Sequence, residues 1–399
     1  MTHAVGVPRG ALGKIVVATV AVQAVIVMAS LTVPVLASLI FVEAGVPPYL
    51  VGYYSSVIYG CAAATSLATP GLMRRWGGIR LHQGMLLMTA VAVLALLPAV
   101  PMGFVASAFV LGMAYGPMNP ASTVLLAEHT AVALRSRVFS LKQTAVPAGG
   151  ALAGSAMPVA AAALGWRGAM ISIAVICAGL AILIQPWRAG LDRSRMPRRR
   201  LADSGFWLPA KVLWQPGMRA VALASFAFGA VQFSFSAVFP TVLVGEGWSL
   251  KAAGLVLSTA LAVGVGCRIV WGSIADRLGS RLILGLLGVV MGTAAAVAAF
   301  LTPDWPTLAV IGLAALFGVS AYCWAGIGLA ETVHRAPPGL ISEASAGMIA
   351  LTFLGALAGP ALFSTITVLT GSFRPAFLIL GALTVLSGGA LVRPLKRGI

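Results

Sequence analysis

Long apolar runs recur along the whole chain, separated by short polar segments. Each run has about 18 or more residues, enough for an α-helix to cross a hydrocarbon core of about 30 Å. Barrel strands, by contrast, are alternating segments of about ten residues, which these continuous runs do not resemble. The pattern therefore predicts an all-α integral membrane protein with twelve spans: 12–40, 49–70, 82–100, 103–127, 137–163, 167–186, 218–244, 251–272, 282–301, 305–330, 343–369 and 373–392.

The second half of the chain repeats the first. Because several matches keep a nearly constant offset, inherited duplication explains them better than chance. The sequence predicts an N-terminal six-helix bundle at 1–186, a basic linker at 187–217 and a pseudo-symmetric second six-helix bundle at 218–399. The matches, at offsets of 202 to 206 residues, are GALAG at Gly150 and Gly355, LAE at Leu126 and Leu329, and the pairs Gly116 with Gly318, Pro34 with Pro240 and Gly77 with Gly279.

The distribution of charged residues predicts how the spans are oriented in the membrane. Only 9% of residues are charged, the mean hydropathy is +1.00 and the formal net charge is +17. All but three of the 26 Lys and Arg residues fall on one side of the predicted spans, the exceptions being Arg167, Lys251 and Arg374. The positive-inside rule then predicts a multi-pass protein of the inner (cytoplasmic) membrane with both termini and the linker in the cytoplasm. This distribution disfavours nucleic acid as a partner and makes the lipid bilayer the main surroundings.

The residue pattern does not indicate an enzyme. The four histidines are scattered without metal-ligand spacing, and no nucleophile or nucleotide-binding arrangement is present. The cysteines lie inside predicted spans without paired spacing, as small packing residues do. We therefore expect no catalytic residue, no metal and no cofactor. The cysteines are Cys61, Cys177, Cys267 and Cys323.

One polar loop carries a motif. The pattern G-x-x-x-D-R-x-G-x-R lies between spans 8 and 9 and consists of Gly272, Asp276, Arg277, Gly279 and Arg281. Twelve spans in two halves, with this loop after span 8, resemble the major facilitator superfamily over essentially the whole chain. In that family the loop also follows span 2. Here the first copy is degenerate, because Pro70 replaces the glycine and Arg74 replaces the aspartate.

The motif suggests a gate. Gly272 would let two helices approach closely, and Asp276 would face the positive N-terminal end of span 11 near Ser342. Arg277 and Arg281 could pair with Glu331 at the end of span 10. The resemblance implies that such contacts, around the turn at Gly279, brace the two halves in the outward-open state. A loop that only sets topology would need basic residues but no aspartate.

The repeated GALAG falls in spans 5 and 11, and each copy offers a G-x-x-x-G face for close helix contact. In the family that the chain resembles, these spans border the interface where the halves rock about a central site.

Charged residues inside spans are the strongest functional signal, because burying a charge in a bilayer is costly. All nine acids lie at span ends or in loops, whereas Arg268 and Lys142 lie within spans 8 and 5. The resemblance places these spans face to face. Each cation could instead extend to the cytoplasmic interface, since long basic side chains snorkel.

Arg268 also stands four residues before the loop glycine, where the similar monocarboxylate carriers place a substrate-binding arginine. Two departures weaken this match: Gly264 occupies the place of their aspartate, and span 11 has no lysine of the oxalate-carrier kind. Further polar side chains could line the same cavity or could be satisfied by helix packing. They are Tyr115, Asn119, Gln143, Gln232, Tyr322 and Trp324.

The sequence thus predicts a secondary active or facilitative transporter that works by alternating access. Its expected cargo is a small organic anion with a carboxylate, carried alone or with a proton or counter-anion, and its expected state is a monomer. A multidrug or hydrophobic-compound exporter is the alternative, and a receptor of the same fold is a third reading. The spans lack the acid and the span-4 arginine that proton-driven exporters of this superfamily usually carry, and VPAGG in span 5 matches their motif poorly.

Overall fold

The computed structural model describes residues 9–129, 138, 141–192, 208–215, 218–337 and 341–392. Every regular element within these ranges is a helix. The first half contains α1 (Arg9–Val35), α2 (Ala37–Glu43), α3 (Val51–Trp76), α4 (Gly78–Leu94), α5 (Pro101–His129), α7 (Ala145–Ile184) and α8 (Arg188–Leu191). After α9 (Leu208–Leu213), the second half contains α10 (Arg219–Gly245), α11 (Leu250–Leu278), α12 (Ser280–Ala298), α13 (Thr307–Ala321), α14 (Trp324–Arg335), α15 (Ile341–Thr370) and α16 (Arg374–Val392).

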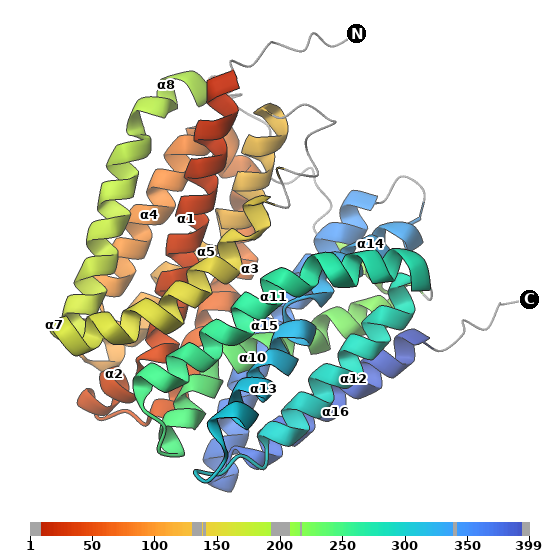
Figure 1. Ribbon diagram of the computed structural model, residues 1–399. Coiled ribbons are helices and arrows are strands. Elements are labelled where there is room, and N and C mark those ends of the chain that lie inside the picture. The colour runs from red at the N-terminus through yellow and green to blue at the C-terminus, as the bar shows by residue number, and fades with distance from the viewer. Residues whose placement is uncertain are drawn as a thin grey trace, which may run out of the picture.

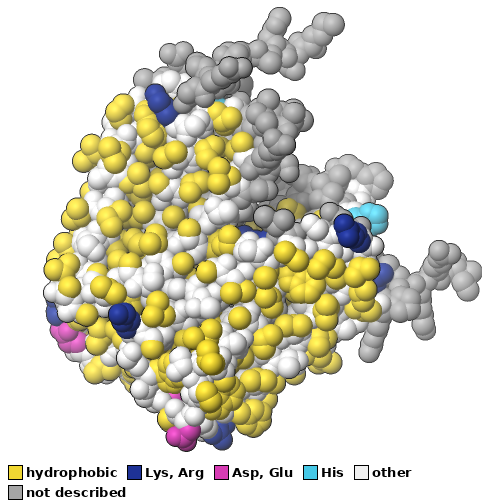
Figure 2. All heavy atoms as spheres, viewed as in Figure 1, with side chains coloured by type: hydrophobic (Ala, Val, Ile, Leu, Met, Phe, Trp, Pro, Cys, Tyr) yellow, Lys and Arg dark blue, Asp and Glu magenta, His cyan; other side chains and the backbone are white. Residues whose placement is uncertain are grey.

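The all-α membrane fold is confirmed, whereas the count of twelve spans stays a prediction. Nine helical stretches of the described residues are long and apolar enough to cross a bilayer, and Gly78–Leu94 is a shorter apolar helix. One of the nine, 141–187, includes α7, in which two helices meet at Gly165 with a φ of +71°. Hydrophobic side chains dominate the visible face of both halves, as expected for a surface against lipid (Figure 2).

Equivalent helices pack in equivalent ways in the two halves. In the first half α1 packs on α7, α3 on α5, and α4 on both α5 and α7. In the second, α10 packs on α15, α11 on α13, and α12 on α16. This parallel pattern is what a duplicated bundle requires. The boundaries drawn at 186 and 218 stay a prediction, and most of the linker (193–207 and 216–217) lies outside the described residues.

The halves meet along a seam in which α7 packs on α11 and α3 packs on α15. In Figure 1 the halves converge near α2 and diverge toward the ends marked N and C. Hydrogen bonds also cross the seam near its convergent end. Ser364 Oγ donates to Tyr49 O at 2.6 Å, and the hydroxyls of Tyr53 and Thr365 lie 2.6 Å apart.

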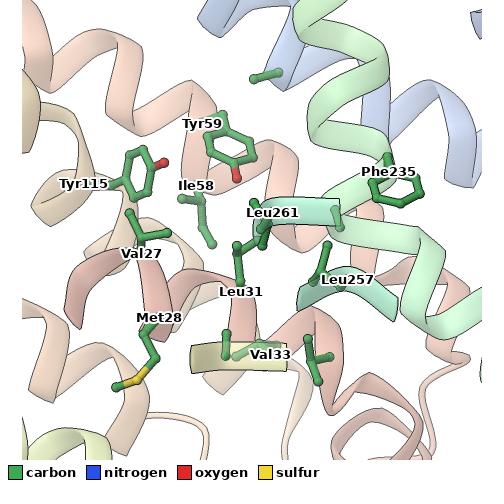
Figure 3. Close-up of a cluster of buried hydrophobic side chains, with 14 of the residues drawn as sticks. Val27, Met28, Leu31, Val33, Ile58, Tyr59, Tyr115, Phe235, Leu257 and Leu261 are labelled. Carbon is green, nitrogen blue, oxygen red and sulfur yellow. The ribbon is translucent and has the colours of Figure 1, made fainter. Parts of the chain in front are cut away.

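The two GALAG copies do not play equivalent roles. Gly150 and Gly154 face α11 of the other half, and a Cβ on Gly150 would meet the side chain of Leu261 at 2.5 Å. Figure 3 shows Leu261 beside Leu31 of α1 in this buried cluster. Gly355 and Gly359 instead lie against the backbone of α10 within their own half. Close helix contact is present at both copies, but the seam uses only the first.

Candidate functional site and motif loop

Arg268 lies on α11 and reaches across the seam. Its Nε–H donates to the backbone oxygen of Tyr322 at 2.8 Å, and its Nη1 donates to the backbone oxygen of Gln143 at 3.4 Å. Gln143 precedes α7 in the other half, so one guanidinium connects both bundles. In this structure the side chain is therefore held in the seam. The Gln143 side chain itself is exposed.

The Tyr322 carbonyl is available because the helix is interrupted there. The α13 helix ends at Ala321 and α14 begins at Trp324, which leaves Tyr322 and Cys323 in a turn. Carbonyls at a helix end lack their intrahelical partners and accept hydrogen bonds from other groups. The arginine thus satisfies one of these carbonyls.

Lys142 points into its own half. Its ammonium donates to the Asn119 side-chain oxygen, to Asn119 O at 3.3 Å and to Thr123 Oγ1 at 3.4 Å, all on α5. The residue is only 1% exposed. These acceptors match the three donors of a lysine ammonium. Thr123 was not among the predicted site residues, because a threonine in an apolar span gives no sign of which neighbour it faces.

Aromatic rings join the halves near the two cations. The Tyr59 ring of α3 meets Tyr115 of α5 edge to face, with centroids 5.7 Å apart. Across the seam the same ring contacts Phe233 of α10, with centroids 4.4 Å apart. Figure 3 shows Tyr59 and Tyr115 with their hydroxyls in the same buried region. Sequence reasoning missed Tyr59, since a tyrosine in an apolar run looks like a packing residue.

Polar groups of the second half hold one another in place. Trp324 Nε1–H donates to Gln232 Oε1 at 2.9 Å, and the Tyr322 and Ser236 hydroxyls lie 2.5 Å apart. The Trp324 ring also meets Phe228 edge to face. Some predicted residues are thus linked within one half, Lys142 with Asn119 and Trp324 with Gln232. Arg268 and Tyr59 make contacts across the seam.

Arg268 and Lys142 bring positive charge to this region. Among the described side chains, no carboxylate forms an ion pair with Arg268 or Lys142. The ion pairs that are present, Arg167–Glu43, Arg188–Asp192 and Arg335–Glu331, involve other residues. An electropositive seam with aromatic walls suits an anionic ligand rather than a cationic one.

The motif loop connects α11 and α12 at one end of the second half. Gly279 adopts a φ of +91° between α11 and α12, a value that favours glycine. Glu331 accepts a hydrogen bond from Arg335, one turn along α14, and interacts electrostatically with Arg281. Arg281 Nε–H donates to Leu391 O at 2.8 Å, while Arg277 is exposed. Arg335 is thus a partner of Glu331, beside Arg281, that the sequence did not suggest.

Two expectations for this loop stay predictions. Among the described residues, a Cβ on Gly272 would meet no atom within 4 Å, so they show no close helix contact at this glycine. The side chains of Asp276 and Ser342 lie outside the described residues, so the brace between them stays a prediction.

Comparison with known proteins supports this architecture. The family model described as "Major Facilitator Superfamily" matches residues 19–360. A relative from Bacillus subtilis (strain 168), described as a hexuronate transporter, is 24% identical over 313 residues, which cover 71% of this chain and 70% of that protein.

Solved structures share the fold at low sequence identity. A POT family transporter in complex with 5-aminolevulinic acid superposes with a TM-score of 0.77 at 14% identity, over 97% of this chain and 96% of the other. A bacterial homologue of the human lysosomal transporter Spinster, inward-facing and unoccupied, gives a TM-score of 0.71 at 14% identity, over 96% and 95% of the two chains.

Proposed function

The chain belongs to the major facilitator superfamily and is a multi-pass membrane transporter, and from this premise we propose that its cargo is a small organic anion with a carboxylate. The observation that carries the proposal is the placement of Arg268. It is a cation between the two halves that has backbone carbonyls, and no described carboxylate, as its partners. A guanidinium binds a carboxylate through two parallel charge-assisted hydrogen bonds, which are stronger than bonds to a neutral carbonyl.

The geometry suggests how binding is linked to movement. A substrate carboxylate would take the place of Gln143 O, the longer of the two contacts, and Tyr322 O would keep the Nε–H. Losing the Gln143 contact removes one tie between the halves. Transporters of this architecture work by rocking one half against the other around a midplane site. Substrate binding would then favour this rocking directly.

The remaining site residues fit a sugar-sized acid. Tyr59, Tyr115 and Tyr322 offer ring faces and hydroxyls, and such amphipathic rings bind compact polar ligands well. The hexuronate transporter relative, whose name denotes a sugar that carries a carboxylate, supports the same class of cargo. Lys142 and Asn119 contribute a second positive region, and Gln143, Gln232 and Trp324 complete the lining.

We further propose that both termini and the linker are cytoplasmic and that the membrane is the inner one, from the bias of Lys and Arg. The convergent end of the seam would then face outward, and this conformation would be inward-facing. The motif residues Gly272, Asp276, Arg277, Gly279, Arg281 and Glu331 would form the inner brace of the opposite state.

Arg268 provides the test. Arg268→Ala should weaken binding of small carboxylates by a factor of about thirty to several thousand, because losing a desolvated charge-assisted pair costs about 2–5 kcal/mol. Arg268→Lys keeps the charge but loses the planar fork, so we expect an intermediate affinity. Lys251→Ala, an exposed cation on the same helix, is the matched control.

The measurement is uptake of a panel of sugar acids and monocarboxylates in proteoliposomes, normalised to folded protein. Ligand-induced thermal stabilisation in detergent reports binding separately. Anion uptake by Arg268→Ala at the level of Lys251→Ala would overturn the proposal and favour the exporter.

A further inference from the structure

A buried histidine lies one turn into α4 and plays no part in the cargo binding described above. The residue, His82, is only 1% exposed, and each of its ring nitrogens lies beside an oxygen atom. Nδ1 lies 2.7 Å from the backbone oxygen of Gly78, and Nε2 lies 3.2 Å from the hydroxyl oxygen of Ser122 on α5. These two partners therefore decide which protonation state of the ring is stable.

The two oxygen atoms suit a ring that carries two N–H groups. The Gly78 carbonyl can only accept a hydrogen bond, so Nδ1 must donate to it. The Ser122 hydroxyl donates to Met118 O at 2.6 Å, which leaves its oxygen as an acceptor toward Nε2. A neutral imidazole has one N–H and cannot donate to both oxygen atoms, whereas an imidazolium donates to both.

The same contact also accommodates the neutral ring after one rearrangement. When Nε2 of His82 loses its proton, the Ser122 hydroxyl turns away from Met118 O and donates to Nε2, since a hydroxyl rotates to suit its partner. Proton binding thus forms one N–H bond at Nε2, with the proton taken from water, and reverses the direction of one hydrogen bond. Histidine is the side chain whose charge ordinarily changes between about pH 5 and 8.

Two charged groups of the described residues act on this ring in opposite senses. The helices that pack on α4 are α1, α3, α5, α7 and α8. Lys142, just before α7, repels a proton on His82, and Asp192, just after α8, attracts one. Thr123, which accepts a hydrogen bond from Lys142, directly follows Ser122 on α5. The ring and the ammonium are therefore linked through adjacent residues of one helix. Exposed cations on α4 and its neighbours are Lys14, Arg75 and Arg80.

We propose that His82 is a proton-binding site and that its proton is bound together with the anionic cargo. The coupling rests on the proposed function, in which Lys142 contributes positive charge to the cargo site. A bound carboxylate offsets part of the Lys142 charge, so the repulsion that opposes a second cation at His82 falls. Because such coupling is reciprocal, a proton on His82 also strengthens binding of the anion.

NMR spectra of the full-length protein with isotope-labelled histidine, in detergent and without cargo, test the proton site alone. Replacing His3, His129 and His334 with Gln leaves His82 as the one histidine of the chain and assigns its signal without changing that residue. We expect this signal to change from a charged to a neutral ring between about pH 5 and 8. A signal that stays constant over this range would overturn the proton site, whether or not any anion binds.

Proton uptake on addition of glucuronate, in weakly buffered detergent solution, tests the coupling. The wild type should take up protons with the sugar acid, and its affinity for glucuronate should fall about fivefold between about pH 5.5 and about pH 7.5. Both effects should be lost in His82→Gln, which should still bind glucuronate. His334→Gln removes an exposed histidine and should behave as the wild type does.

Ser122→Ala gives a second variant that keeps the histidine. It removes the oxygen that accepts from Nε2–H, so the charged ring is disfavoured and proton uptake should weaken. Uptake that persists unchanged in both His82→Gln and Ser122→Ala would overturn the site. Glucuronate binding without proton uptake and without pH dependence would overturn the coupling but leave the anion cargo intact. Failure of the wild type to bind glucuronate or any other small carboxylate would overturn the proposed function and with it the coupling, and the NMR titration would still decide the proton site.

Discussion

Gly154 and Gly254 face each other across the seam with no room for a side chain between them. A Cβ on Gly154 would lie 2.3 Å from Gly254 O, and a Cβ on Gly254 would lie 2.1 Å from Gly154 O. Real Cβ atoms do not approach backbone oxygens so closely, so any larger residue must push α7 and α11 apart. This glycine pair sets how closely the two halves approach.

Gly154→Ala should therefore disfavour this conformation. Overpacking a tight contact costs about 1–3 kcal/mol, which shifts a two-state population by a factor of about five to more than one hundred. We expect faster labelling of a cysteine at Thr241, whose hydroxyl contacts Pro34 O across the seam, in a background without native cysteines. Gly266→Ala on α11 is the control, because a Cβ there meets no atom of the described residues within 4 Å. Identical labelling of the two variants would show that the glycine pair does not set the approach.

Asn119 and Lys142 should be energetically coupled. Asn119→Ala removes the side-chain acceptor of a buried ammonium, and a hydrogen bond to a charged group contributes about 1.5–3 kcal/mol. Once Lys142→Met has removed the ammonium, Asn119→Ala should cost far less. A double-mutant cycle of unfolding in detergent measures the difference. Additive effects of the two substitutions would mean that this contact contributes nothing to stability.

Glu43 should give the first half an acid-sensitive contact. Its carboxylate accepts from Arg167 at 2.5 Å and from Trp166 Nε1 at 2.6 Å, and the hydrogen bond from Arg167 is the main cause that lowers the pKa of Glu43. A lowered folded-state pKa stabilises the protein above the ordinary glutamate pKa of about 4.3, and this contribution is lost as the pH falls through the folded value.

Thermal midpoints of the wild type and Glu43→Gln should accordingly differ at pH 7 and converge below about pH 4. Asp304→Asn, an exposed acid between α12 and α13, should follow the wild type throughout. A difference between the wild type and Glu43→Gln that persists with the same size below pH 4 would exclude the ionised carboxylate as its cause.

The proposed orientation can be checked by labelling single cysteines in intact cells. A cysteine at Ser204 in the linker should resist a membrane-impermeant reagent until the membrane is opened. One at Thr302, between α12 and α13, should react at once. Reversed reactivity would place the linker outside and contradict the charge-based orientation.

Much of the fold can be predicted from features of the linear sequence. Apolar run length gives the spans, constant offsets give the duplication, and the unusual position of Arg268 within a span marks it as a candidate site residue. The sequence does not show which neighbour each face of a helix packs against, because an apolar run is apolar on every face. For this reason GALAG at 150 and at 355 read alike yet pack on different partners.

Contacts between residues far apart in the chain also could not be predicted from the sequence. Asp192 accepts hydrogen bonds from residues 112 and 113 positions away, and nothing local to either segment signals the contact. Likewise the turn at Tyr322 contains neither proline nor glycine, so the interruption between α13 and α14 gave no sign in the sequence.

That interruption has a consequence for the turnover of an unloaded transporter. Under the proposed function, Arg268 stays buried between the halves while they rock, and an unpaired guanidinium there would be costly. The Tyr322 carbonyl, which belongs to the same half as Arg268, accepts a hydrogen bond from it and can move with it. The protein thus contains a built-in counter-dipole for its own cation, which would lower the barrier for the empty return stroke.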